Sequence, residues 1–93
     1  MSDADLVRAV AVEVMGWSGT RYQWFPTKSW DDAMMVVAWM RGKGCAWLIR
    51  DYGGKLGEVQ IGDEYVGFDP GDHDSIRRAI LEAALAEVRE GGA

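Results

Sequence analysis

Residues 69–74 hold the densest group of chemically reactive side chains in the sequence. They read Asp-Pro-Gly-Asp-His-Asp and include His73, the only histidine. Carboxylates and an imidazole are ligands that a divalent cation accepts, so a small metal-dependent hydrolase could be built on them. The spacing is not that of an EF-hand loop, and no second cluster lies nearby in sequence. The simpler interpretation is a solvated turn that leads into a capped helix.

Other kinds of catalytic chemistry have weaker support. Cys45 is the only cysteine, so it can form no disulfide within the chain, and as a nucleophile it would need His73 as its base. It begins an apolar stretch, which favours a role as a small buried hydrophobic residue. Acid–base catalysis needs paired carboxylates in a cleft, whereas Asp51, Glu58 and Asp63 lie on segments that we expect to be exposed. We therefore expect a non-enzymatic protein with no cofactor and no bound metal.

A second group of side chains suggests binding instead of catalysis. Residues 17–28 form an irregular connection in which aromatic and basic side chains are interleaved. Aromatic rings can stack on a nucleobase while Lys and Arg pair with its phosphates. The predicted nucleotide-binding residues are Tyr22 and Trp24 for stacking, with Arg21, Lys28, Arg41 and Lys43 for phosphate. The alternative is that the aromatic loop only covers the core, because bulky aromatic side chains are commonly buried.

Length and composition limit the possible protein classes. The 93 residues make one domain, residues 1–93, and we expect residues 91–93 to fray. Hydrophobic residues are 48% of the chain, enough for a dense core, and the net charge of −5 disfavours non-specific binding along nucleic acid. The first residues lack the pattern of a signal peptide, and the longest apolar stretch, residues 33–40, is too short to cross a bilayer. We expect a cytoplasmic protein with no membrane partner.

Capping residues and hydrophobic spacing predict two helices in the first half of the chain. The first covers about residues 3–15, with Ser2 as its N-cap and Gly16 at its end. The second covers about residues 30–41, with Ser29 as its N-cap. Both helices are expected to pack on the sheet that follows them, because a sheet must bury its apolar face against another element.

Three strands and a last helix are predicted in the second half. The strands cover about residues 45–52, 55–61 and 64–68, and glycine-containing turns join them. The last helix runs from a cap at Asp74 or Ser75 to about residue 90. The order is therefore helix-helix-strand-strand-strand-helix, and the short turns make the sheet an antiparallel three-stranded meander.

The first strand predicts how the helices cover this sheet. Residues 45–49 read Cys-Ala-Trp-Leu-Ile, which is apolar on both faces, whereas a strand exposed on one face alternates apolar with polar residues. We therefore predict an α+β fold arranged as a three-layer α/β/α sandwich. In it the first strand is central or otherwise well covered. The second strand, which carries Glu58 and Gln60, is an edge.

The second helix predicts an interface. Residues 33–40 are apolar almost all the way round, whereas a helix on the outside of a domain has a polar face. A chain of this length cannot cover so much apolar surface, and exposed apolar patches mark interfaces. We predict a homo-oligomer, most simply a symmetric dimer, through Met35, Trp39 and Met40. The alternative is that the aromatic loop folds back over the helix.

Several motifs together resemble the phage ABA-sandwich domain family. They are Val14-Met15-Gly16-Trp17, Ser29-Trp30-Asp31-Asp32-Ala33, Val36-Val37 through Met40-Arg41 with Gly44, and Ala79-Ile80 with Ala83-Ala84-Leu85. The resemblance covers almost the whole chain. It implies an ABA-sandwich fold and a phage or prophage origin, and it carries no catalytic residue across.

The resulting hypothesis is a non-enzymatic phage protein that counters host antiviral defence. It would bind a host defence protein or sequester a nucleotide immune signal in a pocket between subunits. One alternative is a structural, assembly or regulatory accessory protein of the phage without a small ligand. The other is the metal-dependent hydrolase, which would use Asp69, Asp72, His73 and Asp74.

Overall fold

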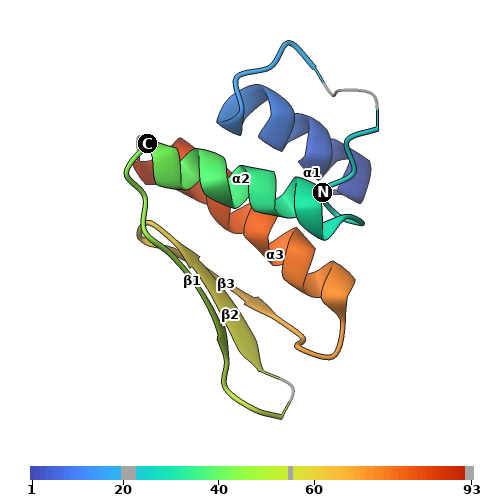
Figure 1. The fold of residues 1–93 in the computed structure, drawn as a ribbon, viewed down its shortest axis with the longest axis vertical. Coiled ribbons are helices and arrows are strands. Elements are labelled where there is room, and N and C mark those ends of the chain that lie inside the picture. Colours follow the sequence, from blue (N-terminus) through green and yellow to red (C-terminus); the bar gives the residue numbers. More distant parts are fainter. Residues whose placement is uncertain (20–22, 55, 92–93) are drawn as a thin grey trace.

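The structure is a computed structural model that describes residues 1–19, 23–54 and 56–91. Two helical segments precede three antiparallel strands, and a last helical segment follows them. The predicted α+β class, element order and antiparallel meander are therefore confirmed. Figure 1 shows that the helices group together and that the strands project away from them.

The first helical segment begins as α1 (Asp3–Ala9) and continues as the π-helical segment η1 (Val10–Val14). Ser2 caps it as predicted, because its hydroxyl accepts a hydrogen bond from the amide of Asp5 at 3.2 Å. Gly16 follows the segment with a φ of 74°, a conformation that glycine adopts without steric cost. The side chains that this segment buries are Leu6, Val10, Ala11 and Val14.

The second helix, α2 (Trp30–Gly42), begins at the predicted cap. The hydroxyl of Ser29 accepts a hydrogen bond from the amide of Asp32 at 3.3 Å. The helix buries one stripe, composed of Ala33, Val36, Val37 and Met40. This spacing places all four side chains on one helix face, so the opposite face is left for solvent or a partner.

The strands are β1 (Trp47–Asp51), β2 (Gly57–Ile61) and β3 (Glu64–Phe68), in the order β1-β2-β3. Ile49 pairs with Val59, and Val59 pairs with Val66, so these three side chains share one face of the sheet. The neighbouring row is Leu48, Gln60 and Tyr65, and it lies on the other face. The first row packs on the core, and the second faces outward.

The last helix, α3 (His73–Ala86), continues as the π-helical segment η2 (Glu87–Gly91). Its N-cap is Asp72, whose carboxylate accepts hydrogen bonds from two amides of the first turn. The predicted cap at Asp74 or Ser75 is therefore wrong, because the helix already begins at His73. This helix supplies the centre of the core, including the fully buried Ile80 and Leu81.

The helices form layers on one face of the sheet. α3 packs on β2 and β3, while α1, η1 and α2 pack mainly against α3 (Figure 1). Apolar side chains from all of these elements meet in a single core cluster. None of the helices in the described ranges has the length and apolar character needed to span a membrane.

The predicted position of the first strand within the sheet is wrong. β1 is an edge strand and β2 is the central one, the reverse of the prediction. β1 is exposed along most of its length, whereas β2 alternates buried and half-buried residues. The reason is that the described helices lie on one face of the sheet, so the sheet is an outer layer instead of the middle of an α/β/α arrangement.

Candidate interaction surface

The carboxylates of the Asp-His segment shape the turn before α3. Asp69 Oδ1 accepts a hydrogen bond from the amide of Gly71 at 2.9 Å. Asp72 Oδ1 accepts from the amides of Asp74 and Ser75 at 3.0 and 3.3 Å, which is the N-cap geometry. These contacts involve one oxygen of each carboxylate, as expected for a turn leading into a capped helix.

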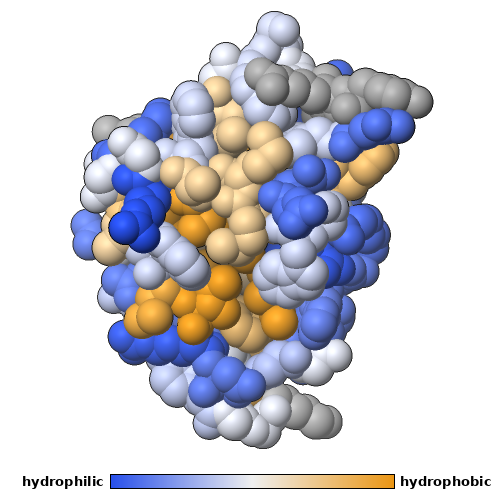
Figure 2. Space-filling model, in the orientation of Figure 1, coloured by the Kyte–Doolittle hydropathy of each residue, from blue (hydrophilic) through white to orange (hydrophobic). Residues whose placement is uncertain are grey.

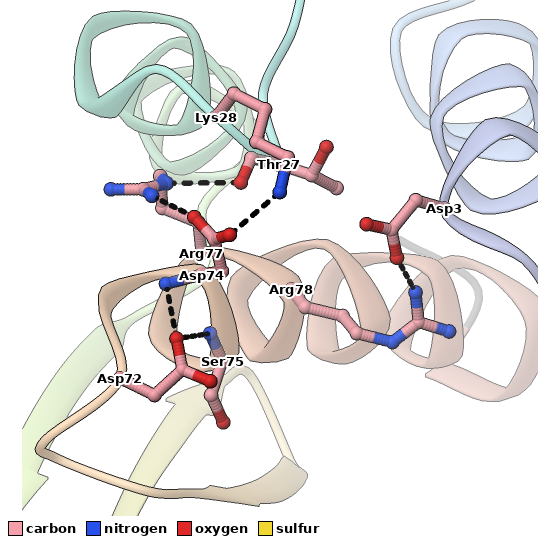
Figure 3. A network of polar contacts seen from close by, with 8 residues as sticks. All are labelled: Asp3, Thr27, Lys28, Asp72, Asp74, Ser75, Arg77 and Arg78. Carbon is pink, nitrogen blue, oxygen red and sulfur yellow. Dashed lines mark hydrogen bonds and ion pairs between the residues drawn. The ribbon is translucent and has the colours of Figure 1, made fainter.

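Asp74 links this turn to the segment before α2 (Figure 3). Lys28 Nζ lies 2.6 Å from one carboxylate oxygen, and the guanidinium of Arg77 donates to the other. The hydrogen bond from Lys28 and then that from Arg77 lower the pKa of Asp74, since both favour its ionised form. Arg77 is buried, and its Nε donates to the carbonyl oxygen of Thr27 at 3.1 Å. Its guanidinium also lies 5.2 Å from the ring centroid of Trp30.

His73 lies at the surface beside the same aromatic residue. Its Nδ1 accepts a hydrogen bond from Trp30 Nε1 at 3.5 Å, and the two rings meet edge to face. Within the described ranges, no three His, Cys, Asp or Glu side chains are arranged to hold a metal ion. The histidine and its acidic neighbours thus have structural contacts that account for their positions.

The aromatic residues predicted to stack on a nucleotide are placed differently from the prediction. Arg21 and Tyr22 lie outside the described residues. Trp24 is only 5% exposed, and its ring meets Trp17 edge to face at a centroid distance of 4.8 Å. A buried ring cannot stack on a base, so the predicted stacking role of Trp24 is wrong, and its ring covers the core. Its Nε1 has no hydrogen-bond partner among the described residues.

The predicted phosphate-binding cations do not meet in one pocket. Lys28 precedes α2 and is paired with Asp74, and this pairing raises its pKa. Arg41 and Lys43 lie at the other end of the same helix, roughly 20 Å away at the usual rise per residue. Among the predicted cations that the structure describes, Arg41 and Lys43 are both exposed and close in sequence, so these two could act together.

An open hollow of about 450 Å³ lies between α1 and residues 24–27. Asp3, Asp5 and Arg8 supply its charged lining, and Phe25 is the exposed aromatic residue beside it. Carboxylates outnumber the single guanidinium here, so the hollow disfavours a phosphate-bearing ligand.

Two of the three residues predicted for an interface lie on the outward face of α2. Met35 and Trp39 are each 41% exposed, and they are one helical turn apart. Met40 is fully buried in the stripe that packs on the core. Its predicted place in an interface is therefore wrong, because it lies on the opposite side of the helix from Met35.

Trp39 is held in place on this face. Its Nε1 donates a hydrogen bond to the carbonyl oxygen of Val14 at 2.7 Å, which ties α2 to the end of η1. Lys43 Nζ lies 5.5 Å from the centroid of the same indole. Figure 2 shows that hydrophobic surface is not confined to α2 but continues towards the sheet.

The sheet adds apolar surface that the sequence reasoning assigned to the core. Trp47 and Leu48 of β1 are both more than one third exposed, and Tyr65 of β3 is exposed on the outer face. Tyr52 and Leu56 extend this surface at the turn after β1. The signal in the sequence was the shortage of helices, because three helices of this length cannot cover both faces of a sheet and one another.

Acidic side chains gather where the β2–β3 turn meets the end of the chain. Glu87 is buried, and its carboxylate accepts a hydrogen bond from the amide of Asp63 at 3.2 Å. A hydrogen bond with Glu90 raises the pKa of Glu64, and desolvation adds to the effect. This acidic group lies close to the loop that follows α2, because the amide of Gly62 in the same turn donates to Ala46 O at 2.8 Å.

Comparisons with protein-family models, with curated proteins and with solved structures find no match to this chain. The resemblance to the phage ABA-sandwich family stays a prediction.

Proposed function

We propose that the protein is a non-enzymatic binding protein of phage origin that counters host antiviral defence by occupying a surface of a host protein. The phage setting rests on the sequence resemblance alone. The mode of action rests on the outward face of α2.

The exposure of Met35 and Trp39 is the observation that carries this proposal. Single exposed hydrophobic residues are common on soluble proteins, but neighbouring ones mark interaction sites, and Met35 and Trp39 are one helical turn apart. Met and Trp are also enriched at interfaces. The hydrogen bond from Trp39 to Val14 fixes the indole before a partner arrives, which reduces the entropy lost on binding.

The charges around this face indicate the kind of partner. Arg41 and Lys43 are exposed at the end of α2, and Lys43 Nζ lies over the Trp39 ring. Asp31 is exposed at the start of the helix, one turn before Met35. A partner with an apolar centre and an acidic rim opposite Arg41 and Lys43 is complementary to this surface.

The proposal is tested by measuring phage plaquing on bacterial strains that each carry one antiviral defence system. Expression of the wild-type protein is expected to restore plaquing on at least one strain. Met35→Asp puts a charge into the apolar face at an exposed position, so it should abolish the effect without unfolding the protein. Thermal unfolding of the purified variant checks the second point.

Phe25→Asp is the matched control, because it makes the same charge change at a 59% exposed hydrophobic residue outside α2. It should keep the wild-type effect. A wild-type protein without effect on any strain would contradict the anti-defence role. Loss of the effect in Phe25→Asp but not in Met35→Asp would contradict the assignment of the surface.

Nucleotide sequestration is a second candidate, now at a different place. An open hollow of about 410 Å³ at the end of α2 is lined by Arg41 and Trp47, together with residues 44–46. An exposed indole beside a guanidinium can stack on a base and bind its phosphate. Unfolding midpoints measured with cyclic and ADP-ribose-type nucleotides test this candidate. A rise that Trp47→Ala removes would support it, and no rise with any nucleotide would eliminate it.

The two remaining alternatives have no such observation in their favour. In this structure Asp72 caps α3 and Asp74 is ion-paired, so a hydrolase would need both carboxylates for a second role. An accessory role without a small ligand predicts binding to a phage protein through the same face of α2. Testing Met35→Asp against the phage's own proteins separates that role from the anti-defence role.

A further inference from the structure

We propose that β1 is the pairing edge for a second copy of this chain. The two β1 strands run antiparallel with Ile49 opposite Ile49 of the other copy, and the two three-stranded sheets become one six-stranded sheet. This inference is independent of the proposed function, because it concerns the sheet edge and leaves the face of α2 free.

The hydrogen-bond pattern of the β1–β2 ladder shows which backbone groups face this edge. Gly62 donates its amide hydrogen to Ala46 O at 2.8 Å, and Tyr52 donates to Leu56 O at 3.0 Å. In an antiparallel ladder the residues that exchange hydrogen bonds alternate with those that do not. The even-numbered residues of β1 therefore bond to β2. The amides and carbonyls of Trp47, Ile49 and Asp51 point away from it.

Only one symmetric register uses all of these outward groups. Centring the pair on Ile49 places it opposite its own copy and places Trp47 opposite Asp51 of the other copy. Each such pair exchanges two hydrogen bonds, which gives about six across the seam. Centring on Leu48 leaves Asp51 opposite Cys45, whose amide is already bonded to Met40 O. Centring on Arg50 places two guanidinium groups directly opposite, which is destabilising.

The side chains of the strand agree with the Ile49-centred register. Leu48 lies opposite Arg50 of the other copy on the outer face, so no like charges are directly opposed. The strand carries one Arg and one Asp, so its own net charge is zero although the chain is acidic. Ile49, which is half-buried in the monomer, would be covered by its counterpart.

The edge also lacks several of the features that normally prevent pairing. Natural edge strands carry Pro, Lys or a bulge, whereas β1 has neither Pro nor Lys and pairs with β2 in unbroken register. α3 lies over β2 and β3, so β1 extends beyond the helix and leaves room beside it. A strand with free backbone groups, exposed apolar side chains and space beside it is a template for another strand.

Amide hydrogen exchange, measured over a dilution series from millimolar to micromolar protein, tests the seam residue by residue. The amides of Leu48 and Arg50 should be protected at every concentration, because they bond to β2. The amides of Trp47, Ile49 and Asp51 should gain protection only as the concentration rises. Light scattering on the same samples should give a mass approaching twice 10.3 kDa at the high end.

Leu48→Lys is the disrupting variant, because it places an ammonium opposite Arg50 of the other copy at an exposed position of the monomer. Tyr65→Lys is the matched control: it adds the same charge to the same row of the outer face, two strands from the seam. Leu48→Lys should remain monomeric at every concentration, and Tyr65→Lys should dimerise like the wild type. A wild-type monomer throughout the series would overturn the proposal. So would a dimer that survives Leu48→Lys or leaves the three edge amides unprotected.

Discussion

The indole Nε1 of Trp39 donates a hydrogen bond to the carbonyl oxygen of Val14 at 2.7 Å. This contact joins α2 to the end of η1 and holds a half-exposed aromatic ring at the centre of the proposed binding face. The surface is thus part of the packing between two helices.

Trp39→Phe removes this donor while it keeps an aromatic ring on the face. We expect a loss of roughly 0.5–1.5 kcal/mol in the free energy of unfolding, the usual net value of one hydrogen bond. Denaturant titration measures it. Trp47→Phe is the matched control, since the Trp47 indole donates no hydrogen bond within the described residues, and it should lose less. Equal losses would contradict a stabilising role for the Trp39–Val14 bond.

We expect a larger loss of stability from a substitution of Arg77, which lies near the start of α2. Its buried guanidinium bonds to Thr27 O and to Asp74, so Arg77→Met removes the donor to this carbonyl and one of the two cations paired with Asp74. We expect a loss of roughly 2–4 kcal/mol on denaturant titration. Arg78→Met is the control in the next position: its ion pairs are near the surface, so its loss should stay below about 1 kcal/mol. An Arg77 variant as stable as the Arg78 variant would refute the structural role of the buried guanidinium.

Two carboxylates predict opposite dependences of stability on pH. The contact with Glu90 raises the pKa of Glu64. The contribution of Glu64 to stability is therefore present below its ordinary pKa of 4.5, and it is lost as the pH rises through the raised pKa. Glu64→Gln should therefore raise the thermal midpoint at neutral pH, and this gain should vanish in acid.

The pH dependence of stability at Asp74 has the opposite sign. Lys28 and Arg77 lower its pKa, so its contribution is present above the ordinary value of 3.8 and is lost as the pH falls through the lowered pKa. Asp74→Asn should lower the midpoint at neutral pH, and the difference from wild type should close in strong acid. Thermal scans of both variants across this range check the two signs, and a shared sign would be inconsistent with the contacts.

Gly57 and Gly67 form a matched pair of strand glycines. A Cβ at Gly57 would overlap the ring of Phe68, its partner across the ladder, whereas a Cβ at Gly67 meets nothing closer than 3.7 Å. We expect Gly57→Ala to cost roughly 1–3 kcal/mol of stability through overpacking. Gly67→Ala should be nearly neutral. Chemical denaturation compares them, and equal stability would mean that Phe68 does not cover Gly57.

Local signals in the sequence predicted local structure well. The hydroxyls of Ser2 and Ser29 cap the helices that they were expected to begin, because a cap depends on residues within one turn. The third strand has the predicted bounds, residues 64–68. The last helix begins slightly earlier than predicted, since Asp72 offers the same capping chemistry as Asp74 and lies before it.

The position of β1 could not be derived in the same way. The sequence of an apolar strand is the same whether helices cover the strand or it lies exposed at an edge. The sequence pattern gives the type of each side chain and not whether another element covers it. Long-range packing determines which strand is covered. α3 packs on β2 and β3 and makes few contacts with β1. The same limit explains Trp24, whose burial depends on contact with Trp17 across the loop.

The candidate surface was partly readable from helical spacing. The residues Ala33, Val36, Val37 and Met40 repeat at the intervals of one helix face, and this stripe is buried. The same helical spacing places Met40 on the buried face, away from Met35 and Trp39, so this part of the interface prediction could have been avoided. The cations were grouped by their distance in sequence, whereas the length of α2 separates Lys28 from Arg41.

We propose that the protein acts through contact at the face of α2 and not through chemistry at its Asp-His segment. The most direct measurement compares Met35→Asp with His73→Ala in the same plaquing assay, with both proteins shown to be folded. His73 is the only histidine, and it is exposed, so its loss would remove the imidazole on which acid–base or ligand chemistry of the segment would depend. We expect His73→Ala to retain the wild-type effect and Met35→Asp to lose it. The reverse result, with activity lost in His73→Ala and kept in Met35→Asp, would contradict this mode of action.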